Sequence, residues 1–182
     1  MKTQNTALYI LRLAVTLLLV AGIMAAALAL VNHITAPYIA QIKYEKTQKA
    51  IAEVLPGGGE EIAFTDSTGL VTNVYASEKG YAVQVAPIGF DNAITMMVGV
   101  DPEGNILGIS VISHTETAGL GAVAAARNSA GEAFRGQFVG MSDGLAVTKD
   151  GGEVDSITGA TITSRAICEG INAALACARN LG

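Results

Sequence analysis

A cluster of hydroxyl side chains lies in the segment DSITGATITS, Asp155 to Ser164, immediately before the last predicted helix. The hydroxyls belong to Thr158, Thr161, Thr163 and Ser164. Gly159 and Ala160 remove side-chain bulk at a point where the backbone can approach a ligand closely. Unpaired N–H groups and the helix dipole favour an anion at a helix start. The segment could therefore hold a phosphate group, although Ser and Thr also cap helices where no ligand binds.

A second candidate loop, SHTETAGLGA, covers residues 113–122 at the end of a predicted strand. Gly119 and Gly121 flank Leu120 and allow either a positive φ angle or close contact with a flat ligand, although a plain turn would use the same glycines. No second His, Cys or carboxylate stands at metal-ligand spacing around His114, so the sequence predicts no metal site. It also contains no Gly-x-Ser-x-Gly elbow, Walker loop or GxGxxG fingerprint, and we assign no catalytic residue.

The composition bounds what such a chain can do. At 182 residues it is long enough for one anchor and one globular domain. The part after residue 35 carries all 16 acidic residues and nine of the 11 basic ones. An acidic domain without clustered Lys and Arg is a poor partner for nucleic acid. Cys168 and Cys177 lie too far apart along one predicted helix for a disulfide and are read as packing residues.

The excess of apolar residues is concentrated near the start of the chain. Leu13 to Val31 contains no charged residue and is long enough to span a bilayer. The run exceeds the usual apolar region of a cleaved signal peptide, which stays the alternative. Lys2 and Arg12 on the N-terminal side favour a cytoplasmic N-terminus. We therefore expect a single-pass protein of the cytoplasmic membrane, in contact with lipid, whose soluble domain lies on the outer side.

The remaining patterns predict the elements of the soluble part. An amphipathic stalk helix is expected over residues 36–59, capped at Thr35 with Pro37 in its first turn. Runs of β-branched and aromatic residues predict strands, and apolar spacing predicts helices. The strands are Val71–Ala76, Tyr81–Val85, Ile94–Val100 and Ile106–Ile112, with a possible short strand at Leu145–Thr148; the helices cover residues 121–138 and Thr163–Arg179. The fold class is α+β, an antiparallel sheet packed by helices, divided into an anchor (1–35), a stalk (36–59) and a domain (60–182).

The motifs also form a recognisable order: an apolar helix, LPGG, KGYAVQV, MMVGVDPEGNILGISVISHTETAGLG and DSITGATITS. This order resembles the G subunit of the Rnf electron-transport complex and is similar to the C subunit of the sodium-pumping NADH:quinone oxidoreductase. The flavinylation pattern of that family, Asp-x-x-Ser/Thr-Gly-Ala-Ser/Thr, is met by Asp155, Thr158, Gly159, Ala160 and Thr161. The sequence departs from the family at Ala118, where Pro is frequent, and at Gly89–Asn92, where the turn is usually richer in glycine.

The resemblance implies an FMN-binding domain with FMN joined to Thr161 by a phosphoester bond. It places a second set of residues at the flavin site: Glu116, Thr117, Gly119, Leu120 and Gly121. It further implies an electron-transfer subunit of a ferredoxin:NAD oxidoreductase that translocates ions, with other membrane subunits as partners. A flavin transferase would act during maturation. Two alternatives stay open: a free-standing membrane-anchored flavoprotein that feeds another reductase, and a flavin-free binding or assembly module.

Overall fold

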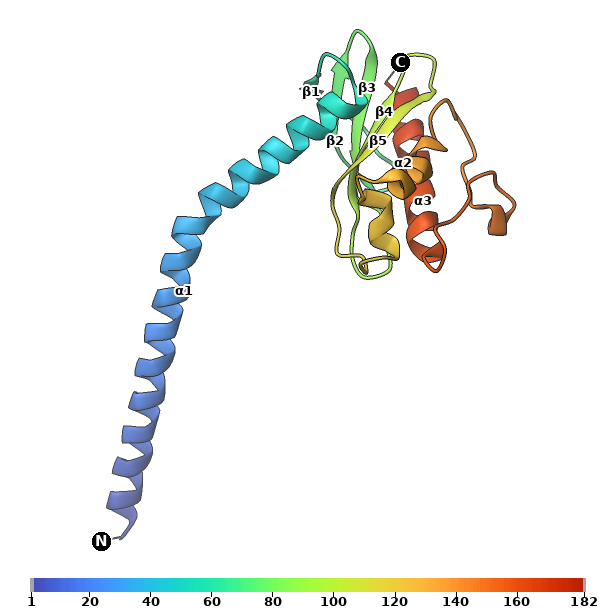
Figure 1. Ribbon diagram of the computed structural model, residues 1–182. Helices are drawn as coiled ribbons and strands as arrows, with labels where there is room; N and C mark the ends of the chain where they lie inside the picture. Colours follow the sequence, from blue (N-terminus) through green and yellow to red (C-terminus); the bar gives the residue numbers. More distant parts are fainter. Residues whose placement is uncertain (1, 182) are drawn as a thin grey trace. The chain divides into compact units, whose positions relative to one another are not determined.

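The computed structural model describes the chain from Lys2 to Leu181, with side chains described from Leu8 onward. It divides into two compact units, Met1–Tyr44 and Glu45–Gly182. Helix α1 (Lys2–Val54) forms the first unit and continues into the second (Figure 1).

The first unit consists of helix α1 alone, and its apolar side chains are exposed. Leu18, for example, is 72% exposed and Leu28 is 67% exposed. Within the described residues, this is one helix that is long and apolar enough to cross a membrane. The predicted helix start at Thr35 is wrong, because the helix runs through Pro37 without a break. The Thr35 hydroxyl donates 2.7 Å back to the carbonyl of Val31 within the helix.

The last turns of α1 belong to the second unit. Ala50, Ile51, Val54 and Leu55 are buried in one cluster with Ala82 and Met97 of the sheet. The approach is close at Gly99, where an added Cβ atom would lie 2.3 Å from the carbonyl oxygen of Val54. Part of the segment expected as a stalk thus supplies apolar side chains to one face of the sheet.

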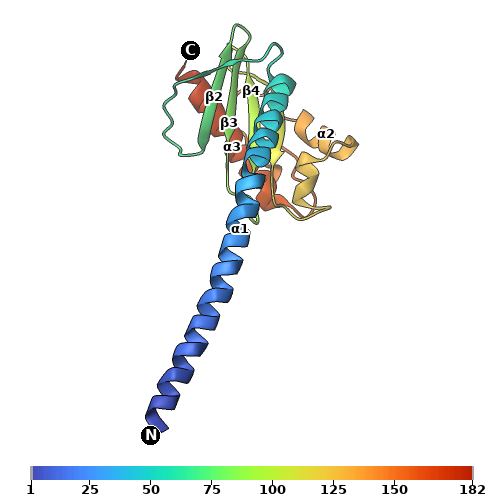
Figure 2. The same ribbon diagram turned by 90° about the vertical axis from the view of Figure 1, so that its left-hand side faces the viewer.

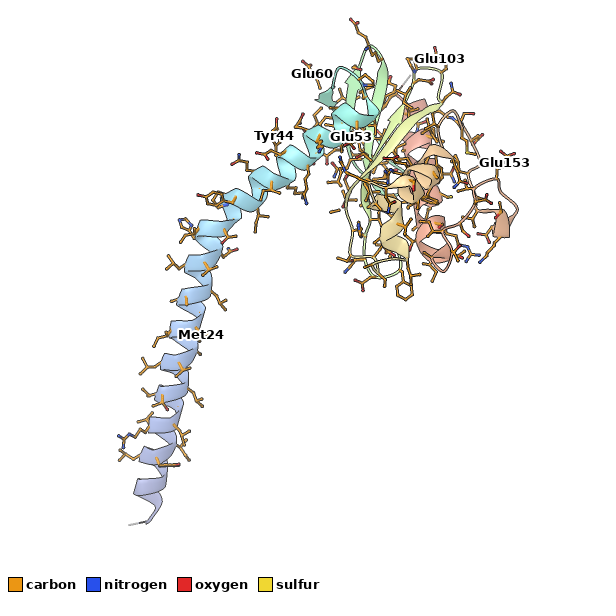
Figure 3. All side chains as sticks on the ribbon, viewed as in Figure 1. Met24, Tyr44, Glu53, Glu60, Glu103 and Glu153 are labelled. Carbon is orange, nitrogen blue, oxygen red and sulfur yellow. The ribbon has the colours of Figure 1, made fainter. Side chains whose placement is uncertain are left out.

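The sheet has five antiparallel strands in chain order. They are β1 (Glu60–Ile62), β2 (Val71–Ser77), β3 (Gly80–Val85), β4 (Thr95–Val100) and β5 (Ile106–Ser113). The last four match the predicted strands within two residues, whereas β1 was not predicted. The hairpin predicted at DPEGN is confirmed by the pairing of Val100 with Ile106. Its tip is marked by Glu103 in Figure 3.

The two faces of the sheet bury different clusters because side chains alternate along a strand. On β3, Ala82 packs with the end of α1, while Val83 and Val85 pack in the main core. That core also holds helix α3 (Thr161–Arg179) and helix α2 (Ser129–Gly136). Figure 2 shows the end of α1 in front of the strands and α3 behind them. The predicted α+β class is confirmed.

Three local predictions are settled by the structure. The helix predicted over residues 121–138 is instead two pieces, a 3-10 turn η1 (Gly121–Ala125) and α2. The segment Leu145–Thr148 is not a strand, because Val147 makes only an isolated bridge to Val154 before the 3-10 turn η2 (Thr148–Asp150) begins. Cys168 and Cys177 are buried and unbonded, as predicted. Burial raises the pKa of Cys168 to about 11, so it is an inert packing residue.

Candidate functional pocket

The two candidate loops meet at a pocket of ≈ 280 Å³. The first loop contributes Glu116, Thr117, Leu120 and Gly121, and the second contributes Gly159, Ala160 and Thr161. Phe90, Lys149, Ile162 and Thr163 complete the lining. Most of the residues expected at the site are therefore brought together, although the two loops are well separated in the chain.

Glu116 joins three segments at the base of this pocket. It is only 7% exposed, and its Oε1 accepts a 2.8 Å hydrogen bond from the backbone N–H of Phe90. Its Oε2 accepts a 2.5 Å bond from the hydroxyl of Thr163 on α3. The carboxylate thus fixes the 89–92 turn and the start of α3 to the first loop. Its engaged oxygens favour a structural role over a proton-transfer role.

Two glycines are required beside this carboxylate. An added Cβ atom at Gly121 would lie 2.3 Å from Oε2 of Glu116 and 2.5 Å from Oγ1 of Thr163. At Gly89 it would lie 2.2 Å from Oε1 of Glu116. These contacts are far too short for a side chain, so Gly121 serves close packing rather than a special backbone conformation.

Helix α3 begins at the pocket without a side-chain cap. Its N-cap is Ala160, which has no side chain able to accept a hydrogen bond. The Ser164 hydroxyl instead accepts a 3.0 Å hydrogen bond from the N–H of Ile157 and donates a 3.0 Å hydrogen bond to the carbonyl of Ala160. The capping interpretation of these hydroxyls is therefore wrong for the N-cap position. The first N–H groups of a helix lack intrahelical acceptors, so this end presents donors toward the pocket.

Thr161 stands at the first helical position, and its hydroxyl has a basic partner. The Lys149 ammonium donates a 3.0 Å hydrogen bond to Thr161 Oγ1. The next residue, Asp150, forms two 2.6 Å bonds with Arg165, one helical turn after Thr161. The hydrogen bonds from Arg165 hold the pKa of Asp150 below its usual value.

Sequence reasoning missed Lys149 as a site residue. The sequence offered only a weak signal for it. Lys149 and Asp150 stand next to each other before two glycines, and Thr161 and Arg165 stand four residues apart on a predicted helix. Only the fold shows that these two pairs face each other.

The outer part of the pocket is apolar. Phe90 is 67% exposed, Ile162 is 50% exposed and Leu120 is 43% exposed, and all three line the pocket. Together they offer apolar surface to a flat ligand at the mouth of a site whose other end is polar. Phe90 occupies the turn in which the sequence departs from the family pattern, and it nevertheless lines the pocket.

Three predicted residues lie outside this lining. Asp155, Thr158 and Gly119 border a separate, more open hollow beside α2. The backbone of Asp155 is held by Gln137, which accepts 2.7 Å from its N–H and donates 3.2 Å to its carbonyl. The Gln137 side chain therefore fixes the start of the loop that leads to Thr161. Gly119 and Gly159 have φ angles of 77° and 76°, which disfavour other residues. Within the described chain, no cluster of His, Cys, Asp or Glu could hold a metal ion.

A family model described as an FMN-binding domain matches residues 89–176. The matched range contains both loops, Lys149 and the start of α3. The pocket fits such a cofactor on its own chemistry. A hydroxyl, an ammonium group and uncapped helix N–H groups suit a phosphate, and three exposed apolar side chains suit a flat ring system.

Curated relatives agree over most of the chain. It is 34% identical over 183 residues to the G subunit of the proton-translocating ferredoxin:NAD(+) oxidoreductase complex of Clostridium ljungdahlii, covering 96% of this chain and 92% of that protein. It is 31% identical over 199 residues to the G subunit of the Na(+)-translocating ferredoxin:NAD(+) oxidoreductase complex of Acetobacterium woodii, covering 94% and 93%. It is 34% identical over 167 residues to the G subunit of the ion-translocating oxidoreductase complex of Pseudomonas aeruginosa, covering 81% and 78%. The chain belongs to the G-subunit family of ion-translocating oxidoreductase complexes and carries that family's FMN-binding domain.

Proposed function

We propose that this protein is the membrane-anchored electron-transfer subunit of an ion-translocating ferredoxin:NAD oxidoreductase complex, and that its FMN is bonded covalently to Thr161. The observation that carries the attachment site is the placement of the Thr161 hydroxyl. It lines the pocket at the uncapped start of α3, 3.0 Å from Lys149.

The residues of the pocket divide into two groups by what they offer. Lys149 and the first N–H groups of α3 would hold the phosphate. Phe90, Leu120 and Ile162 would contact the ring system. FMN, when bound, supplies reversible electron transfer. The chain itself provides position: Glu116 fixes the walls of the pocket, and Gln137 fixes the loop that bears Thr161.

A covalent bond suits a pocket that is partly open to solvent. A tether holds its ligand at high local concentration, so the site does not need to bind free FMN tightly. Attachment would form a P–O bond to Thr161 Oγ1 with loss of the hydroxyl proton. The flavin phosphate must carry a leaving group when it reacts. A separate flavin transferase would use a flavin dinucleotide as the donor, and its nucleoside monophosphate half would be released.

The anchor places this chemistry at the membrane. Helix α1 would span the lipid once, with its N-terminus inside and the FMN-binding domain outside, beside the other membrane subunits of the complex. The exposed apolar residues of α1 support the membrane contact. The orientation is supported by the basic residues that precede the apolar run.

The test is the intact mass of protein matured in cells that contain the transferase, followed by peptide mapping. We expect one added flavin phosphate on the peptide that contains Thr161, and none in Thr161→Ala or in cells without the transferase. Thr161→Ser keeps the acceptor hydroxyl and should retain attachment. Because Thr161 does not cap α3, Thr161→Ala should change the free energy of unfolding by only about 0.5 kcal/mol.

A flavin found on another residue, or an unmodified peptide from wild-type cells, would contradict the attachment proposal. In the same cells, protease added outside spheroplasts should digest the FMN-binding domain. Protection of that domain would contradict the orientation. Purification in mild detergent should bring several membrane subunits with the chain, and isolation of the chain alone would favour a free-standing flavoprotein.

A further inference from the structure

We propose that Lys149 is the positioning residue of flavin attachment. Its ammonium group holds the Thr161 hydroxyl for phosphoryl transfer and then pairs with the negative charge of the resulting phosphodiester. The inference rests on the proposed attachment at Thr161. It assigns a role to a residue that lies outside the attachment pattern.

The position of Lys149 is fixed by its short loop, which Glu153 marks in Figure 3. The N–H of Thr148 donates a 2.9 Å hydrogen bond to the carbonyl of Val154. The N–H of Val154 donates a 3.1 Å hydrogen bond to the carbonyl of Ala146. At Gly152 a Cβ atom would lie 2.0 Å from the carbonyl oxygen of Ala146, so the loop folds tightly upon itself.

The same loop is fastened to the helix that bears the acceptor. Lys149 contacts Thr161, and the adjacent Asp150 contacts Arg165, residues that lie one turn apart on the same face of α3. The ion pair of Asp150 and Arg165 therefore fixes the position of the loop along α3 and holds Lys149 beside Thr161. A lysine on an independent loop would have no such restraint.

Charge at the pocket supports the same role. Among the described residues that line it, Lys149 is the basic one and Glu116 the acidic one. The oxygens of Glu116 are engaged by Thr163 and by the N–H of Phe90. Arg165 is committed to Asp150 through two bonds. Lys149 is thus the side chain placed to meet a phosphate bonded to Thr161.

The hydrogen bond also suits the chemistry of attachment. A hydroxyl has one donor and two acceptor sites. Lys149 donates to one lone pair of Thr161 Oγ1, which leaves the other lone pair to attack phosphorus. The hydroxyl proton is not used in this hydrogen bond and can pass to a base on the transferase. The bond from phosphorus to the departing nucleoside monophosphate breaks as the P–O bond to Thr161 forms. A charge-assisted hydrogen bond to the oxygens of the product is stronger than a neutral one.

The experiment compares attachment rates in full-length apoprotein in detergent, supplied with the transferase and a flavin dinucleotide and followed by intact mass. We expect Lys149→Gln to slow attachment about tenfold, the effect of losing one charge-assisted hydrogen bond in the transition state. Lys149→Arg keeps the charge and should recover most of the rate. Lys79→Gln removes the same charge from the β2–β3 turn, outside the pocket lining, and should match wild type.

A second measurement separates a role at the phosphate from contact with the transferase. In fully loaded protein, the ³¹P resonance of the phosphodiester should shift in Lys149→Gln and return toward wild type in Lys149→Arg. Wild-type attachment rates in Lys149→Gln would overturn the inference, as would a slow Lys149→Arg or an unchanged ³¹P resonance. Failure of wild-type protein to gain mass would instead overturn the attachment at Thr161 itself.

Discussion

At the scale of single residues, the pocket depends on one buried carboxylate that accepts hydrogen bonds from neutral donors. Glu116 accepts from the hydroxyl of Thr163 and from the N–H of Phe90, and Gly121 leaves room for it. A buried polar group that loses its partner destabilises the folded state by more than the hydrogen bond had stabilised it. Glu116 therefore maintains the spacing between the 89–92 turn and the start of α3, where the proposed phosphate site lies.

We predict that Glu116→Ala lowers the free energy of unfolding by about 1–3 kcal/mol, because it leaves the Thr163 hydroxyl and the N–H groups of the 89–92 turn without this acceptor. Glu116→Gln keeps one acceptor oxygen and should fall between Ala and wild type. The measurement is urea unfolding of the full-length protein in detergent, with flavin loading read by mass. Glu169→Ala removes an exposed carboxylate from α3 and serves as the matched control. Equal stability of the Glu116 and Glu169 variants would contradict the structural role of Glu116.

The sequence could predict part of this site, and the limit has a physical cause. Thr161, Gly159 and Ala160 lie together in the chain, so a local pattern identifies them. Phe90 and Lys149 reach the pocket from other segments, and only the packing of the sheet against α3 brings them there. The pattern also grouped Asp155 and Thr158 with Thr161, although the turn at Gly159 directs them to a different hollow.

At the scale of elements, the strands were predicted correctly where burial produces a recognisable pattern of apolar residues. β2 to β5 carry β-branched and aromatic residues bounded by turn residues, and their positions were predicted within two residues. β1 has the sequence EEI with little burial, so its edge pairing leaves no apolar signal. The expectation that Pro37 lies in the first turn of a helix was also wrong, because α1 continues through Pro37 although proline supplies no N–H for the i→i−4 hydrogen bond.

The end of α1 is fastened to the domain by a charged group as well as by apolar packing. Figure 3 places Glu53 at this end. Glu53 Oε2 accepts 2.5 Å from the hydroxyl of Ser110 on β5, and Oε1 accepts 2.7 Å from Arg127. Partial burial alone would raise the pKa of Glu53, but the hydrogen bonds from Ser110 and Arg127 outweigh it and hold the pKa below its usual value. The contact is therefore formed by the ionised carboxylate.

A lowered pKa fixes the sign of the pH dependence. The contribution of Glu53 should be fully present above about pH 4.5 and lost as the pH falls through the lower pKa of the folded state. Because the Glu53 side chain is 37% exposed and Arg127 is 66% exposed, we expect at most about 1 kcal/mol. Glu53→Gln should be less stable than wild type by up to that amount at pH 7, and the difference should shrink as the pH falls through the lowered pKa of the folded state. Urea unfolding across this range is the measurement, and a constant difference would contradict the prediction.

At the scale of the whole molecule, the chain combines two units with opposite solvent requirements. The first unit exposes a long run of apolar side chains, whereas the acidic second unit buries two apolar clusters, one on each face of its sheet. The unit boundary lies within helix α1, at Tyr44–Glu45, rather than at the end of the helix. A boundary drawn at residue 60 from the Pro-Gly-rich turn would remove Ile51, Val54 and Leu55 from their places against Ala82 and Met97.

Two truncations test where the domain begins. Deletion of residues 1–44 keeps every buried residue of the α1 end, so the product should be soluble without detergent and should unfold cooperatively. Deletion of residues 1–59 removes three large buried side chains, each worth roughly 1.5–3 kcal/mol of burial. That loss is a large share of the usual 5–15 kcal/mol of domain stability. We therefore expect the shorter product to aggregate or to melt at a much lower temperature, as measured by circular dichroism. If both products melt alike, the end of α1 is a removable stalk, and the face of the sheet that it covers is stable without it.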